Sequence, residues 1–134
     1  MTTRIALTND LAELSRLASE IAAFGAAHAL SATVMTALGL SLEELVTNVI
    51  DYGFDGGSHH IGVELAIEDG AVRATVTDGG REYNPLERPD PDVRAPLEER
   101  QVGGLGVLLV KQLMDEVRYA RDHGRNVLTV RKRL

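Results

Sequence analysis

The sequence contains no cysteine, which excludes a disulfide framework, a thiol nucleophile and a cysteine-ligated metal site. Its N-terminus has no signal-peptide pattern, and no apolar run approaches the roughly 18 residues that a membrane span needs. Repeats and low-complexity segments are absent, and all four prolines lie within residues 84–101. We therefore expect a soluble, cytoplasmic protein with no membrane partner.

The length and charge of the chain further restrict its domain organisation and its kind of partner. The 134 residues fit one domain, 1–134, which can bury a core without a metal or disulfide staple. The net charge of −6 is uneven: residues 1–110 hold 7 basic and 17 acidic groups, whereas residues 111–134 hold 7 basic and 3 acidic groups. This acidic body argues against nucleic acid as the main partner, and the basic end is interpreted as a solvated strand end.

Hydrophobic periodicity predicts an α+β order. The expected elements are a strand at 5–7, helices at 11–22 (after a cap at Asn9) and from Ser31 or Thr33 to about Tyr52, strands at 61–67 and 72–76, a connection over 84–101, a helix at 105–114, and strands at 117–121 and 127–130. Two helices before a hairpin do not make a repeating βαβ pattern. We therefore predict a two-layer sandwich in which a mixed or antiparallel sheet has its helices on one face.

The run Gly103-Gly104-Leu105-Gly106, followed by apolar residues, is the strongest local signal for a ligand. Three glycines let a backbone approach a ligand closely, and a helix that begins there would direct free N–H groups at an anion. A flexible loop before a core helix has the same composition. Dinucleotide and Walker motifs are excluded, because Leu109 stands where the first needs Gly or Ala and no Gly-Lys-Ser/Thr triplet exists.

Two further patterns carry polar groups suited to a nucleotide. Glu44 and Asn48 lie one helical turn apart, so a carboxylate and an amide oxygen point the same way, as Mg²⁺ or a carboxylate base would require. A plain solvated helix face would look the same. Asp78 and Gly80 end a strand, where a carboxylate could hold an adenine amino group. An ordinary Asp-Gly turn is the alternative, although no strand follows to complete a hairpin.

The proline-rich connection predicts a lid over about residues 84–102, or else a disordered linker. Within it, Arg100 could meet a terminal phosphate or pair with a neighbouring glutamate. The four histidines match no metal-ligand spacing.

Glu44-x-x-x-Asn48, Asp78-x-Gly80 and Gly103-Gly104-Leu105-Gly106, in this order, resemble the ATP-binding boxes of the GHKL, or histidine kinase-like ATPase, superfamily. The short length and the phrases around these boxes look most like the bacterial anti-sigma-factor serine/threonine kinases. The resemblance covers nearly the whole chain. It implies a two-layer α/β sandwich of the Bergerat type that binds ATP and Mg²⁺ beneath a mobile lid.

The resemblance also implies roles for individual residues. Glu44 would be the general base, Asn48 would bind Mg²⁺, and Asp78 would accept the adenine amino group beside Gly80. The phosphates would meet Gly103, Gly104, Leu105 and Gly106 at the start of the last helix, with Arg100 near the terminal phosphate. The sequence departs from its relatives at Tyr52, at Arg81-Glu82 and at Asn126, which lies near a position often held by threonine.

The implied function is phosphorylation of a serine on a STAS-type anti-anti-sigma partner in a partner-switching circuit, with a sigma factor as a second partner and a homodimer as the assembly. The alternative is an ATP-binding adaptor that sequesters a regulator without significant kinase activity. A fragment of a sensor histidine kinase is disfavoured, because no phosphoacceptor-histidine hairpin precedes the ATP-binding elements.

Overall fold

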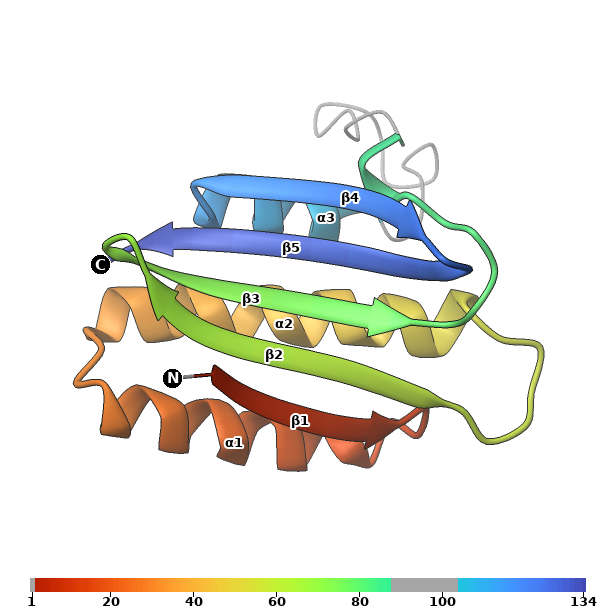
Figure 1. Cartoon of the computed structure of the whole chain (residues 1–134), viewed down its shortest axis with the longest axis horizontal. Helices are drawn as coiled ribbons and strands as arrows, with labels where there is room; N and C mark the ends of the chain where they lie inside the picture. The colour runs from red at the N-terminus through yellow and green to blue at the C-terminus, as the bar shows by residue number, and fades with distance from the viewer. Residues whose placement is uncertain (1, 88–103) are drawn as a thin grey trace.

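The computed structural model describes residues 2–87 and 104–134, which form a two-layer α/β sandwich (Figure 1). In chain order the elements are β1 (Thr2–Thr8), α1 (Glu13–Ala27), α2 (Ala32–Tyr52), β2 (His60–Glu68), β3 (Ala71–Asp78), a 3₁₀ turn (Pro85–Glu87), α3 (Gly104–Leu113), β4 (Glu116–Asp122) and β5 (Arg125–Arg133). The sheet has the order β1-β2-β3-β5-β4, and every neighbouring pair is antiparallel. The predicted element order and fold class are confirmed.

The helices α1, α2 and α3 lie on one face of the sheet, with α2 between α1 and α3 (Figure 1). The strands alternate accordingly: in β3, Val72, Ala74 and Val76 are buried, whereas the intervening polar side chains are half-buried on the open face. Alternation with period two is what a sheet covered on one side requires. The core therefore fills the space between the inner sheet face and the helix layer.

Two tight turns join consecutive antiparallel strands of the sheet. Asp69 and Gly70 join β2 to β3 with φ of 52° and 72°, and His123 and Gly124 join β4 to β5 with φ of 51° and 76°. Two successive residues with positive φ make the turn whose twist matches that of the flanking strands. These turns set the register of both hairpins.

Of the predicted caps for α1 and α2, the cap of α2 is confirmed and the cap of α1 is wrong. Ser31 caps α2, because its hydroxyl accepts a hydrogen bond from the Val34 N–H at 3.2 Å. The expected cap of α1 at Asn9 is wrong, since that side chain instead donates to the Gly57 carbonyl and accepts from the His59 N–H. Asn9 thus ties the start of α1 to the loop before β2, a long-range contact that local sequence cannot reveal.

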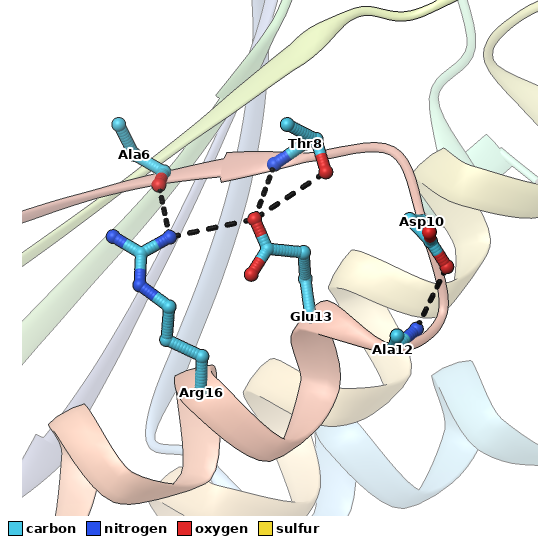
Figure 2. A network of polar contacts seen from close by, with 6 residues as sticks. All are labelled: Ala6, Thr8, Asp10, Ala12, Glu13 and Arg16. Carbon is cyan, nitrogen blue, oxygen red and sulfur yellow. Dashed lines mark hydrogen bonds and ion pairs between the residues drawn. The ribbon is translucent and has the colours of Figure 1, made fainter.

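The end of β1 and the first turn of α1 are joined by the polar network in Figure 2. One carboxylate oxygen of Glu13 accepts from the Thr8 N–H at 3.0 Å, and Arg16 donates to the Ala6 carbonyl at 2.6 Å. The backbone hydrogen bond from Thr8 is the main cause that lowers the pKa of Glu13. Edge-strand carbonyl and N–H groups that would otherwise be open are satisfied in this way.

Helix α2 has the predicted bounds, but it is more apolar along its length than the sequence analysis expects. Among the described residues it is the one helix that is long and apolar enough to cross a membrane, judged by length and composition. In the most apolar stretch of this helix, 44% is buried within the protein. The expectation that no such run exists is therefore corrected. The apolar residues of α2 that lie in the core include Leu38, Leu42 and Val46, all fully buried, and a central core helix has this composition for that reason.

Candidate functional site

A pocket opens where the C-terminal half of α2 faces the ends of β3 and β5. It is lined by Leu45, Asn48, Val49, Gly53, Val76, Asp78, Tyr83, Pro85, Tyr119, Asn126 and Leu128. Most of these groups are apolar, and a few polar groups converge among them, as is typical of small-molecule sites. Two predicted site residues, Asn48 and Asp78, come from separate elements and meet here.

Asp78 is the buried acceptor of this pocket. It is 5% exposed, and its Oδ1 accepts from the Gly80 N–H at 2.8 Å and from Asn126 Nδ2 at 3.0 Å. Within the described residues, Oδ2 accepts no hydrogen bond. A buried carboxylate with one committed and one open oxygen is suited to an amino donor such as the exocyclic amine of adenine.

Gly80 permits a close backbone contact that no side chain would allow. A Cβ at this position would meet the carbonyl oxygen of Gly53 and would lie 2.9 Å from Asp78 Oδ1. The same Gly53 carbonyl accepts from the Arg81 N–H at 3.0 Å, and Arg121 donates to the Gly80 carbonyl at 2.9 Å. The end of α2 and the turn after β3 are thereby fixed side by side.

Glu44 lies at the other end of the site, against the first turns of α3. A Cβ on Gly106 would coincide with the carboxyl group of Glu44, so only glycine leaves room for this carboxylate beside the helix. Burial raises the pKa of Glu44, the Asn48 amide opposes this, and the charges of Asp51 and Glu43 add to the rise. A half-buried carboxylate with a raised pKa beside a helix start is an arrangement that active sites use.

Asn48 carries an unmet polar group. The residue is 8% exposed, and in the part of the chain that the structure describes its Nδ2 has no hydrogen-bond partner of ordinary geometry. A buried N–H donor of this kind calls for a hydrogen-bond acceptor, such as a phosphate oxygen, whereas a cation could be bound only through the amide oxygen. Residues 2–87 and 104–134 contain no cluster of three acidic or histidine side chains able to hold a metal. One amide oxygen, with the remaining positions filled by phosphate and water, is a donor set that suits Mg²⁺.

Several predicted residues fall at or beyond the described ranges. Gly104 begins α3, as expected for a helix that starts within the glycine run, and Leu105 is part of the same helix. Arg100, Gly103 and most of the expected lid lie outside the described residues. The connection begins on the body of the protein: Pro85 is buried, and Asn84 Oδ1 accepts from the Leu86 N–H at 2.9 Å.

Sequence reasoning misses part of the pocket. Asn126 stands out in the sequence only as a departure from relatives, and nothing there singles out Tyr83 or Tyr119. Asn126 is 6% exposed, and its position opposite Asp78 in the β3–β5 register brings the two side chains together. The one local signal is a polar residue at an inward position of an alternating strand.

Solved structures with the same fold support the architecture. The RsbU and RsbW domains of a Mycobacterium tuberculosis protein match with a TM-score of 0.72 at 19% identity, covering 100% of this chain and 32% of that one. The histidine kinase domain of the blue-light activated histidine kinase EL346 of Erythrobacter litoralis matches with a TM-score of 0.59 at 21% identity, covering 92% and 60%. At these identities the likeness shows the fold.

Curated relatives and a family model extend the match to sequence. The serine/threonine-protein kinase BtrW of Bordetella bronchiseptica is 28% identical over 102 residues, covering 75% of this chain and 71% of the relative. The serine-protein kinase RsbW of Listeria monocytogenes is 30% identical over 96 residues, covering 68% and 61%. These relatives agree with the predicted enzyme class. Because the model of the histidine kinase-like ATPase domain matches residues 7–132, nearly the whole chain, the protein belongs to that family.

Proposed function

We propose that this chain is an ATP-dependent protein serine kinase that phosphorylates a STAS-type anti-anti-sigma protein in the cytoplasm. The observation that carries the proposal is the contact between Glu44 and Gly106, which sets a half-buried carboxylate at the start of α3. The N-terminal turn of a helix favours phosphate, so this carboxylate lies beside the place where a terminal phosphate would bind. An acceptor hydroxyl that approaches this phosphate would meet Glu44.

Glu44 is the residue suited to act as the general base. Burial raises its pKa above the ordinary glutamate value, which makes the ionised carboxylate a stronger proton acceptor near neutral pH. In the proposed step the serine oxygen attacks the γ-phosphorus, its proton passes to Glu44, and the bond from phosphorus to the ADP oxygen breaks. Phosphoryl transfer depends mainly on positioning and charge neutralisation, which a small rigid site can supply.

The other site residues are assigned to the base at one end of the site and to the phosphates and Mg²⁺ at the other. Asp78 would accept the adenine amine through Oδ2, while Gly80 lets the base approach the backbone. Asn48 would hold Mg²⁺, which when bound neutralises phosphate charge. From the resemblance, we assign the phosphates to Gly103, Gly104 and Gly106 with Leu105 between them, and the terminal phosphate to Arg100.

The partner assignment rests on the relatives and on the resemblance. RsbW and BtrW are serine or serine/threonine kinases by name, and one structural neighbour contains RsbW and RsbU domains. The family resemblance supplies the STAS-type substrate, the sigma factor as a second partner and the homodimer. The chain spans 71% and 61% of the length of the two curated relatives described above.

The test is phosphate transfer from MgATP to STAS proteins encoded near this one, with the modified serine mapped by mass spectrometry. Glu44→Gln keeps the size of the side chain and should lower the transfer rate by about 10²–10⁴-fold, while ATP affinity changes little. Glu20→Gln on α1 is the matched control, because Glu20 does not line the pocket and its charge is not among those that shift the pKa of Glu44.

Two outcomes would contradict the proposal. If the wild-type protein binds ATP but modifies no STAS candidate, the chain acts as an ATP-binding adaptor. If it binds no nucleotide, the assignment of Glu44, Asn48 and Asp78 to an ATP site fails altogether.

A further inference from the structure

Asn126, which lines the pocket, has its full hydrogen-bonding capacity engaged. Its Nδ2 donates to Asp78 Oδ1 at 3.0 Å and to the Arg81 carbonyl at 2.8 Å. Its Oδ1 accepts from the Tyr119 hydroxyl at 2.5 Å and from the Tyr83 N–H at 3.2 Å. One buried amide therefore joins the ends of β3, β4 and β5 and the segment that follows β3.

The partners leave the Asn126 amide one orientation. A backbone N–H can only donate, so the group that faces Tyr83 must be the amide oxygen. A backbone carbonyl can only accept, so the group that faces Arg81 must be the amide nitrogen. Burial is the main cause that raises the pKa of Tyr119, which keeps its hydroxyl protonated and able to donate. The donor that Asn126 presents to Asp78 is thus fixed from three sides.

This arrangement determines what Asp78 can still bind. Its Oδ1 already accepts from Gly80 and Asn126, so a ligand meets a carboxylate whose Oδ2 accepts no hydrogen bond from residues 2–87 and 104–134. A donor such as an exocyclic amine satisfies that oxygen, whereas a carbonyl oxygen placed there would be repelled. Without Asn126, Oδ1 would keep only the hydrogen bond from the Gly80 N–H, and the orientation of the carboxylate would be held less firmly.

We propose that Asn126 is a positioning residue that determines the preference of the site for a 6-amino purine over a 6-oxo purine. It does so by holding Asp78 in place through one hydrogen bond, while Tyr119 and the Tyr83 backbone hold Asn126. The inference rests on the proposed ATP site and adds to it the residue that sets base selectivity.

The test compares the affinities of ATP and ITP, which carries an oxygen in place of the 6-amino group. The wild-type protein should bind ATP at least about 100-fold more tightly than ITP, because a site built around an amino donor rejects the analogue that lacks it. Asn126→Asp retains the shape but replaces the amide donor with a second carboxyl group, which at this distance from Asp78 either repels its charge or shares its proton. We expect it to weaken ATP about tenfold or more and to leave ITP nearly unchanged, so that the selectivity ratio falls.

Two controls separate positioning from general damage. Thr129→Asp adds the same charge to the same strand but on the open sheet face, and it should keep the wild-type ratio. Asn126→Ser is a second variant whose hydroxyl is too short to span the gap to Asp78, and it should lower the ratio as well. Circular dichroism and thermal unfolding report whether each variant is folded, and a loss of fold alone would weaken both nucleotides together.

The result separates this inference from the proposed function. If the wild-type protein discriminates between ATP and ITP while both Asn126 variants keep that ratio, the positioning role is overturned and the ATP site stands. If the wild-type protein binds neither nucleotide, the ATP site fails, and the role of Asn126 fails with it.

Discussion

The two ends of the candidate site, the pocket around Asp78 and the contact of Glu44 with α3, differ in how completely the protein satisfies its own polar groups. At the Asp78 end, Asn126 makes four hydrogen bonds and Asp78 Oδ1 accepts two. At the Glu44 end, the carboxylate is half-buried with a raised pKa that the Asn48 amide only partly offsets, and the buried Nδ2 of Asn48 makes no hydrogen bond of ordinary geometry within the described residues. The first end is built in advance to recognise a flat base, whereas the second leaves groups whose needs a phosphate and its cation would meet.

Glycine substitutions test this contrast most strongly at the Asp78 end. Gly80→Ala would place a methyl group against the backbone carbonyl of Gly53, which cannot move without shifting the end of α2. We expect a loss of about 2–3 kcal/mol of stability together with loss of nucleotide binding, measured by denaturant unfolding and by titration. Gly79→Ala is the neighbouring control, since a Cβ there has nothing within 4 Å. Equal stability of the two variants would show that the turn after β3 is not tightly packed.

The same contrast explains which features of the fold and of the site could be predicted from the sequence. Among the described residues, periodicity predicted each strand and each α-helix, because the sheet is covered on one side and its hairpins are short, whereas the 3₁₀ turn at Pro85–Glu87 was not predicted. Glu44 and Asn48 could be paired from helical spacing alone. Asn126 could not be assigned a role, because its meeting with Asp78 depends on the β3–β5 register across 48 residues of chain. The error at Asn9 has the same origin, since its partners lie near residue 59.

A glycine substitution at the Glu44 end should act differently. Gly106→Ala would collide with the Glu44 carboxyl group, the far end of a flexible side chain, and alanine is favoured over glycine within a helix by about 1 kcal/mol. Stability should therefore stay within about 1 kcal/mol of the wild type, while the displaced base lowers phosphate transfer by roughly 10²-fold.

Gly39→Ala supplies the control for this prediction, because Gly39 lies inside α2 and a Cβ added there would have nothing within 4 Å. It gains the same helix propensity without touching the site, so stability should rise and transfer should be unchanged. Unimpaired transfer by Gly106→Ala would mean that the contact between Glu44 and α3 has no part in catalysis.

The smallest expected effect is a gain of stability from removing the catalytic charge. Because burial raises the pKa of Glu44 in the folded state, the folded protein binds a proton there more tightly than the unfolded chain does. The associated stability is present below the unfolded-state pKa and is lost as pH rises through the folded-state pKa, so at neutral pH the ionised Glu44 destabilises the folded protein.

Glu44→Gln should therefore raise the midpoint of thermal unfolding by about 2 °C at pH 7. The gain should vanish as the pH is lowered below the ordinary glutamate range, because Glu44 is then protonated in both states. The wild-type transfer rate should decline over the same interval as Glu44 takes up its proton. A variant less stable than the wild type at pH 7 would mean that favourable contacts hold the Glu44 carboxylate, as hydrogen bonds hold Asp78 at the other end of the site.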